Sequence, residues 1–131
     1  MIYVNKLWQD CRMPKTLPKV DISAPVCCAP VAAGPLDDDA ALGIALRLKA
    51  LADPVRVRLV SLLFGSPAGE ECSRDLAHAV GVSEPTVSHH LSQLRRAGIV
   101  ESERRGMSVY HRAGRESLVA LCRVLDPNCC G

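Results

Sequence analysis

The sequence predicts a mainly α-helical fold with one small β-hairpin, and three observations support this. Apolar residues recur at the helical period in successive segments between residues 36 and 126. Only 3% of the 131 residues are aromatic, so the core should be aliphatic. Two short segments on either side of Gly106 have the residue pattern of β-strands, which is typical of a hairpin. A chain of this length is expected to form one domain.

The chain divides into an arm, a domain and a tail. Residues 1–35 contain five of the nine prolines and no sustained periodicity, which predicts an irregular arm. Residues 36–126 carry the periodic segments and form the predicted domain. Residues 127–131 form a short tail that contains Cys129 and Cys130.

Two helices are expected at the start of the domain. Asp37, Asp38 and Asp39 suit the positive end of the first helix, and Pro54 both ends that helix after Ala52 and opens the second. In the first helix, Leu42, Ala45, Leu46 and Lys49 follow at helical spacing. The core face expected in the second consists of Val57, Val60, Leu63 and Phe64.

Residues 73–97 predict two short helices joined by a tight turn. We expect Ser73 to cap the first helix and Gly81 to end it in a left-handed conformation. Ser83 caps the second helix and Pro85 falls in its first turn, where a missing N–H does little harm. The apolar seam of the second helix is Val87, Leu91 and Leu94.

The second of these helices has a wide polar face opposite its apolar seam. Hydroxyl, imidazole, amide and guanidinium groups can donate to phosphates and to base edges in the major groove, so we interpret it as a DNA-recognition helix. An ordinary surface pair of helices is the alternative, because its exposed faces are also polar. The residues expected to contact DNA from this segment are Ser83, Pro85, Thr86, Ser88, His89, His90, Gln93 and Arg96.

A hairpin and a last helix complete the domain. Ile99 to Arg105 and Met107 to Arg112 read as two strands, and Arg104 and Arg105 at the tip are suited to touching phosphate beside the recognition helix. The last helix begins near Arg115, and its apolar stripe is Leu118, Leu121, Cys122 and Leu125. Together with the first helix, it presents more apolar surface than one small domain covers, which predicts a homodimer.

Charge and cysteine content narrow the function classes. The net charge is only +2, but residues 73–112 hold six arginines against four acids, so positive charge is local to the predicted DNA-binding unit. No apolar run is long enough to span a membrane and no signal peptide is recognisable, which predicts a cytoplasmic protein. Seven cysteines in such a compartment favour ligands, redox groups or buried residues over disulfides.

Three stretches carry a resemblance to a known family. They are LKALADPVRVRLVSLL (48–63), the pair Glu71-Cys72, and DLAHAVGVSEPTVSHHLSQLRRAGIVESERRGMSVYHR (75–112). Together they resemble the ArsR/SmtB family of winged-helix metal-responsive repressors. The resemblance covers roughly residues 40–125. It implies a winged helix-turn-helix homodimer that represses an operon by binding double-stranded operator DNA, and that leaves the DNA when a toxic metal or metalloid binds.

The cysteines suggest what is sensed. Arsenic- and antimony-sensing relatives carry Cys-x-Cys-x-x-Cys at the start of the first helix-turn-helix helix, but here only Cys72 matches, and Arg74 and Ala77 hold the other positions. Cys27 and Cys28 are adjacent, which makes them poor disulfide partners and good joint thiolate donors. We therefore expect Cys27, Cys28 and Cys72 to bind As(III) or Sb(III), from one subunit or from two. Cys129 and Cys130 form a possible second site, and Cys122 is expected to be interface filler.

Other functions remain open at this level. The same cysteines can serve a redox-sensing repressor through intersubunit disulfides, or a sensor of divalent cadmium, lead or zinc. An enzyme such as a thiol-dependent arsenate-processing protein is a remote alternative, and the sequence does not predict one. The chain has no Cys-x-x-Cys and no cysteine followed by a phosphate-cradling loop.

Overall fold

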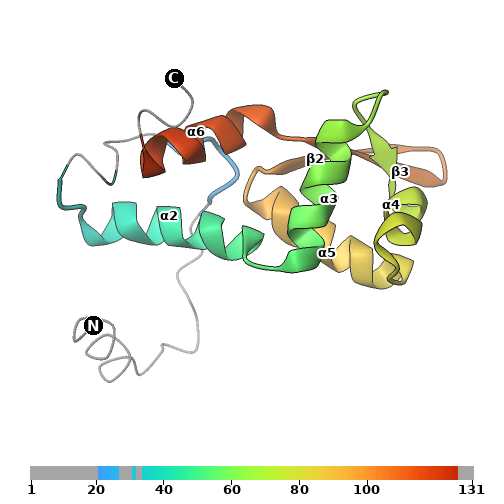
Figure 1. Ribbon diagram of the computed structural model, residues 1–131, viewed down its shortest axis with the longest axis horizontal. Helices are drawn as coiled ribbons and strands as arrows, with labels where there is room; N and C mark the ends of the chain where they lie inside the picture. The colour runs from blue at the N-terminus through green and yellow to red at the C-terminus, as the bar shows by residue number, and fades with distance from the viewer. Residues whose placement is uncertain (1–20, 27–30, 32–33, 127–131) are drawn as a thin grey trace.

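The computed structural model describes residues 21–26, 31 and 34–126, and these contain helices α2 to α6 and a small sheet (Figure 1). Helices α2 (Asp38–Leu51) and α6 (Arg115–Leu125) lie side by side at one end of the molecule. The other end contains α3 (Pro54–Gly65), α4 (Ser73–Val80), α5 (Glu84–Arg96) and the sheet. The predicted mainly α fold with a small β-hairpin is confirmed.

Aspartates begin the first two helices. The Asp37 side chain caps α2 by accepting from the Ala40 N–H at 2.7 Å. The Asp53 carboxylate caps α3 by accepting from the backbone N–H groups of Val55 and Arg56 at 2.8 and 3.2 Å. Pro54 follows as the first residue of α3, where no N–H is needed. The chain therefore turns sharply between α2 and α3, as the sequence predicts.

The helix-turn-helix forms as expected except at its first residue. Gly81 ends α4 in the left-handed region with φ of 76°, and the Ser83 hydroxyl caps α5 by accepting from the Thr86 N–H at 3.3 Å. The expectation that Ser73 caps α4 is wrong. Cys72 holds the cap position, and the Ser73 hydroxyl is instead hydrogen-bonded to the ring of His111.

The sheet has one strand more than the sequence predicts. Strands β2 (Val100–Arg105) and β3 (Ser108–Ala113) form the expected antiparallel hairpin, and β1 (Glu71–Cys72) pairs with the other edge of β3. In this register Glu71 lies opposite His111, and Cys72 lies opposite Tyr110. The short β1 therefore joins the hairpin directly to the start of α4.

The apolar residues form two clusters. The larger joins α3, α4, α5 and the start of β2, and it includes the fully buried Leu59, Val87 and Leu94. The smaller joins α2 to α6 through Ile44, Leu121 and Val124. Residues 21–26 contribute Ile22 to the edge of the first cluster and Val26 to the edge of the second.

Three expected helix faces are partly wrong. On α3, Val60 and Leu63 are buried as expected. Val57 and Phe64 are 53% and 41% exposed, because the buried face of the helix includes Leu59 and they lie outside it. On α6, Leu125 is exposed, and the buried face follows Ser117, Leu121 and Val124. The buried positions of α2 are Ile44, Arg47 and Ala50, which differ from the expected stripe because residues 21–26 and α6 pack on that side.

No helix within the described residues is long and apolar enough to cross a bilayer.

Candidate nucleic-acid interface and thiol site

Helix α5 presents a polar face opposite its buried seam. Most of the side chains predicted to contact DNA lie on this surface: Pro85, Thr86, Ser88, His89 and Arg96 are exposed, and Gln93 is half-buried. The Ser83 and Thr86 hydroxyls lie 2.8 Å apart, so they hold each other at the start of the helix. Since Val87, Leu91 and Leu94 are fixed in the core, the orientation of the polar face is fixed as well.

His90 differs from the other residues of this face. Its side chain is half-buried, and its Nδ1 accepts a hydrogen bond from Arg56 Nε of α3 at 3.1 Å. A neutral imidazole that accepts at Nδ1 must carry its proton on Nε2. Arg56 also donates to the Ala50 carbonyl. The pair therefore ties α5 to the preceding helices.

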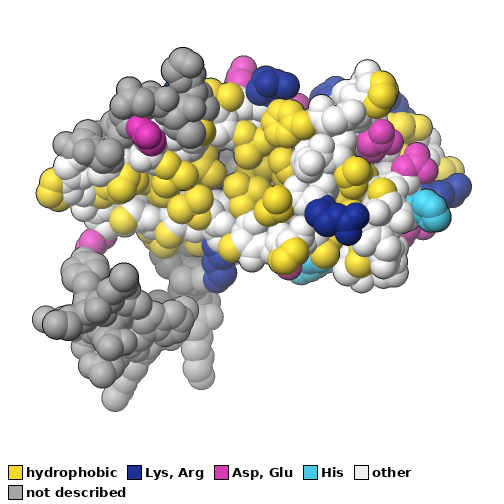
Figure 2. All heavy atoms as spheres, viewed as in Figure 1, with side chains coloured by type: hydrophobic (Ala, Val, Ile, Leu, Met, Phe, Trp, Pro, Cys, Tyr) yellow, Lys and Arg dark blue, Asp and Glu magenta, His cyan; other side chains and the backbone are white. Residues whose placement is uncertain are grey.

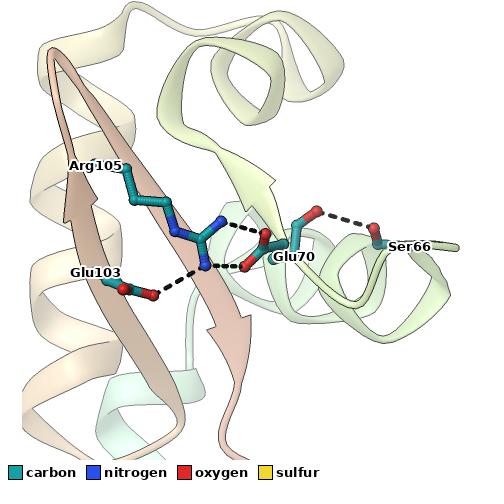
Figure 3. Close-up of polar contacts among 4 residues, drawn as sticks. All are labelled: Ser66, Glu70, Glu103 and Arg105. Carbon is teal, nitrogen blue, oxygen red and sulfur yellow. Dashed lines mark hydrogen bonds and ion pairs between the residues drawn. The ribbon is translucent and has the colours of Figure 1, made fainter.

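Arg105 at the end of β2 lies in an ionic cluster (Figure 3). Its guanidinium donates to both carboxylate oxygens of Glu70 at 2.6 and 2.9 Å, and to Glu103 at 2.9 Å. It also lies 4.8 Å from the centre of the Tyr110 ring. The hydrogen bond to Glu70 is the main cause that raises the pKa of Arg105, and Arg105 in turn lowers the pKa of Glu70. This arginine fastens the hairpin to the loop before β1.

Arg104 is the more available cation of the hairpin. Its side chain is exposed, and the hydrogen bond that it makes within the described residues is a long one of 3.5 Å from Nε to the Gly106 carbonyl at the tip. The structure thus separates two arginines that are equivalent in the sequence. Arg104 can turn to a phosphate without breaking an ion pair, whereas Arg105 cannot.

Cys72 lies where the sheet meets the helix-turn-helix. It is the last residue of β1 and the cap residue of α4, and it is half-buried. Its thiol donates to Asp75 Oδ2 at 3.2 Å, so the hydrogen-bond partner of the sulfur is a carboxylate. It lines a groove of about 410 Å³ that also reaches Ser88 of α5 and Met107 at the tip of the hairpin.

A buried histidine connects the residue next to Cys72 with the hairpin. His111 of β3 is 4% exposed, and its two ring nitrogens lie 2.7 Å from the hydroxyls of Ser73 and Ser102. Burial, with a smaller contribution from Arg95, lowers the pKa of His111 below its ordinary value. The neutral ring therefore bridges α4, β3 and β2.

The other predicted ligands, Cys27, Cys28, Cys129 and Cys130, lie outside the described residues. Within the part that is described, no three or more His, Cys, Asp or Glu side chains are grouped to hold a metal ion. Cys122 is half-buried on α6, and neither it nor Cys72 is disulfide-bonded.

Sequence reasoning missed the partners of these residues. The alternation of β3 places Val109 and His111 on one face, which indicates that His111 points inward, but it does not identify Ser73 and Ser102 as its neighbours. Glu70 lies in a loop with no periodicity, and its pairing with Arg105 depends on β1, which is too short to be recognised from its residues.

Known proteins resemble this chain over the same region. The family model described as "Bacterial regulatory protein, arsR family" matches residues 53–102. The chain is similar to the arsenic resistance transcriptional regulator ArsR1 of Pseudomonas putida, with 45% identity over 64 residues. That alignment covers 49% of this chain and 48% of the Pseudomonas protein, so about half of that relative is matched.

Two further similarities extend over more of the relative. The biofilm growth-associated repressor of Xylella fastidiosa is 34% identical over 82 residues, which are 63% of this chain and 69% of that protein. The solution structure of the homodimeric winged helix-turn-helix DNA-binding domain Mb0332 of Mycobacterium bovis, described as a possible ArsR-family transcriptional regulator, matches with a TM-score of 0.55 and 32% identity. It covers 70% of this chain and 84% of that domain.

Proposed function

This chain belongs to the arsR family of bacterial regulatory proteins, and we propose that it is a dimeric repressor that leaves its operator when cysteine thiolates bind As(III) or Sb(III). The observation that carries the proposal is the position of Cys72. Cys72 is the last residue of β1, which pairs with the hairpin, and it also occupies the N-cap position of α4, the first helix of the helix-turn-helix. A ligand bound there acts on both parts that approach DNA.

DNA recognition is assigned to the polar face of α5. Ser88, His89 and Gln93 present donors and acceptors that match base edges, while Arg96 and Arg104 supply charge for phosphates. His90 and Arg105 are assigned a structural role in holding this surface in place, because both are already hydrogen-bonded within the protein. The relatives from Pseudomonas and Xylella are named as a transcriptional regulator and a repressor, which supports this assignment.

Dimerisation is assigned to the apolar surface that runs over α2 and α6 and onto the exposed side of α3 (Figure 2). Leu48, Val57, Phe64 and Leu125 are each between 38% and 53% exposed, which is costly for large apolar groups left in water. A second copy covers them and places two α5 helices on successive major-groove faces, about 34 Å apart. The homodimeric Mycobacterium domain supports this arrangement.

Inducer binding is assigned to Cys72 together with Cys27 and Cys28. Three thiolates suit a soft, three-coordinate ion better than zinc, which takes four ligands in structural sites. Cys72 must lose its proton to become a ligand, and this breaks its hydrogen bond to Asp75 in the first turn of α4. The name of the Pseudomonas relative supports arsenic as the inducer.

The route from Cys72 to the DNA-contacting surface has two branches. Movement of β1 displaces β3 through their shared register, and it also displaces Ser73, which His111 links to Ser102 of β2. The Glu70–Arg105 ion pair joins the far end of β2 to the loop residue that directly precedes β1. A coupling free energy of about 1 to 3 kcal/mol between inducer binding and operator binding, transmitted through these contacts, weakens operator binding about 5- to 150-fold.

An operator gel shift with increasing arsenite tests the proposal. Wild-type protein should release DNA, and Cys72→Ser should bind DNA as tightly but fail to release it. Cys122→Ser is the matched control and should behave as wild type. Normal release by Cys72→Ser would eliminate the proposed site. Release by peroxide alone would instead support redox sensing, and release by cadmium or zinc but not arsenite would support a divalent-metal sensor.

A further inference from the structure

A second groove lies where the C-terminal end of α5, the start of β2 and the start of α6 meet. We call it the α6 groove, and its volume is about 540 Å³. Among the described residues, none lines both this groove and the groove beside Cys72. A volume of this size is typical of small-molecule pockets. The α6 groove is therefore separate from the thiol site and large enough for a small ligand.

Two glycines allow three stretches of backbone to meet at the α6 groove. A Cβ at Gly114 would overlap the carbonyl oxygen of Gly98, and a Cβ at Gly98 would overlap the carbonyl oxygen of Ser23. The Gly114 N–H also donates to the Ile99 carbonyl at 2.6 Å. The start of α6 is therefore held in a fixed position against the end of the recognition helix.

The start of α6 offers backbone donors to the groove. Gly114 holds the cap position, so this helix has no side-chain cap. The N–H groups of Arg115, Glu116 and Ser117 have no acceptor within the described part of the chain, and all three residues line the groove. Open N–H groups and the positive end of the helix dipole together favour an anion.

The hydroxyl of Ser117 faces the same groove without a partner. Ser117 is 8% exposed, and its Oγ lies 2.9 Å from the position that a Cβ at Gly98 would take. The hydroxyl makes no hydrogen bond to the described residues, yet its oxygen is not sealed from solvent, because it borders the groove. A largely buried hydroxyl without a partner is costly, so a ligand oxygen that accepts its proton would remove this cost.

Arg95 supplies a free positive charge at the groove. It is exposed, and it forms no ion pair with the described residues. Two acids also line the groove, but Glu101 lies 3.6 Å from Arg112, and Glu116 is exposed to solvent. A planar guanidinium matches the oxygens of a phosphate group. The charge of the groove is therefore most favourable for an anion beside Arg95.

We propose that the α6 groove binds a phosphate-type oxyanion through the N–H groups at the start of α6, the Ser117 hydroxyl and Arg95. The ligand is free phosphate or a small phosphate monoester, since both present the same tetrahedral oxygens. A bound anion joins the end of the recognition helix to α6, which is a helix of the assigned dimer surface. The site goes beyond the proposed function, because none of its residues takes part in inducer binding.

An NMR titration of the full-length ¹⁵N-labelled protein tests the proposal. Sodium phosphate and glycerol phosphate are added in separate experiments, and chloride keeps the ionic strength constant. Each should shift the amide resonances of residues 115–117 in a saturable way. A lower Kd for glycerol phosphate would identify a phosphate monoester as the ligand, whereas an equal or higher Kd would identify free phosphate.

Four variants identify the groups that hold the anion. Ser117→Ala and Arg95→Gln should each raise the Kd about tenfold, as expected for loss of a hydrogen bond to a charged group. Ser117→Ala removes an unpaired hydroxyl, so the fold should persist. Glu116→Gln should lower the Kd, because it removes a negative charge from the groove. Arg123→Gln removes an exposed arginine from the last turn of α6 and is the matched control, with an unchanged Kd.

The absence of saturable shifts at residues 115–117 would overturn the proposal, and so would the same Kd in Ser117→Ala and wild type. Operator binding provides another test. If its salt dependence fell by about one unit of slope in Arg95→Gln but not in Arg123→Gln, the groove would contact the DNA backbone instead, which would also overturn the proposal. These measurements contain no arsenite, so their outcome is independent of the proposed thiol site.

Discussion

Replacement of His111 by alanine tests whether the buried ring joins the hairpin to the helix-turn-helix. The ring is 4% exposed and is held by the Ser73 and Ser102 hydroxyls, each at 2.7 Å. Loss of two hydrogen bonds at about 1 kcal/mol each, together with a small cavity, should lower the free energy of unfolding by about 3 to 4 kcal/mol. Ser73→Ala and Ser102→Ala each remove one hydrogen bond and should cost about 1 kcal/mol.

The same histidine should make stability depend on pH. Burial and, to a lesser extent, Arg95 lower the pKa of His111 in the folded protein below the ordinary value of 6.5. As the pH falls through this value, the unfolded chain takes up a proton that the folded protein refuses. Stability is therefore complete above about pH 7 and declines as the pH falls below 6.5, until the folded-state pKa is also passed. In His111→Ala this contribution should disappear.

Urea denaturation at about pH 7.5 and about pH 5.5 measures both effects. The protomer concentration must be the same in every experiment, because a dimer's stability depends on it. The reasoning would be refuted if His111→Ala cost no more than Ser73→Ala, or if it lost stability towards acid as steeply as the wild type does.

Three further predictions follow from other parts of the structure. Gln93→Ala should reduce the preference for operator over unrelated DNA by about 1 to 3 kcal/mol, measured by competition in fluorescence anisotropy, and equal loss on both DNAs would contradict a base contact. Arg104→Ala should reduce the salt dependence of operator binding by about one unit of slope, and Arg105→Ala should reduce it less because Arg105 is already paired with carboxylates; the reverse order would contradict the assignment. Gly98→Ala should lower the free energy of unfolding, measured in urea, more than Gly81→Ala does. Both glycines have positive φ, but only at Gly98 would the new Cβ also overlap the Ser23 carbonyl. Equal decreases would show that residues 21–26 move away from the new side chain without a cost in stability.

Local signals in the sequence account for much of the fold. The acidic start of α2 at Asp37 to Asp39, the cap at Ser83, the break at Pro54 and the turn at Gly81 each depend on a few neighbouring residues, and the structure confirms them. The polar face of α5 also follows from helical spacing alone. These features need no knowledge of the remote chain.

Features that depend on remote contacts were not predicted. Strand β1 has two residues and no pattern of its own, yet it determines that Ser73 faces His111 instead of capping α4. The burial of Arg47 follows from the docking of residues 21–26, which an irregular arm gives no reason to expect. In the same way, the sequence treats Arg104 and Arg105 as one basic tip, and only the position of Glu70 distinguishes them.

The most direct test of the account is X-ray absorption at the arsenic edge of protein loaded with arsenite. Arsenic coordinated by three sulfur atoms in the wild type, reduced in Cys72→Ser and in Cys27→Ser/Cys28→Ser but not in Cys122→Ser, is the predicted result. Coordination that survives loss of Cys72 unchanged, or arsenic bound without sulfur, would contradict the claim that this thiol at the base of the DNA-reading unit senses the inducer.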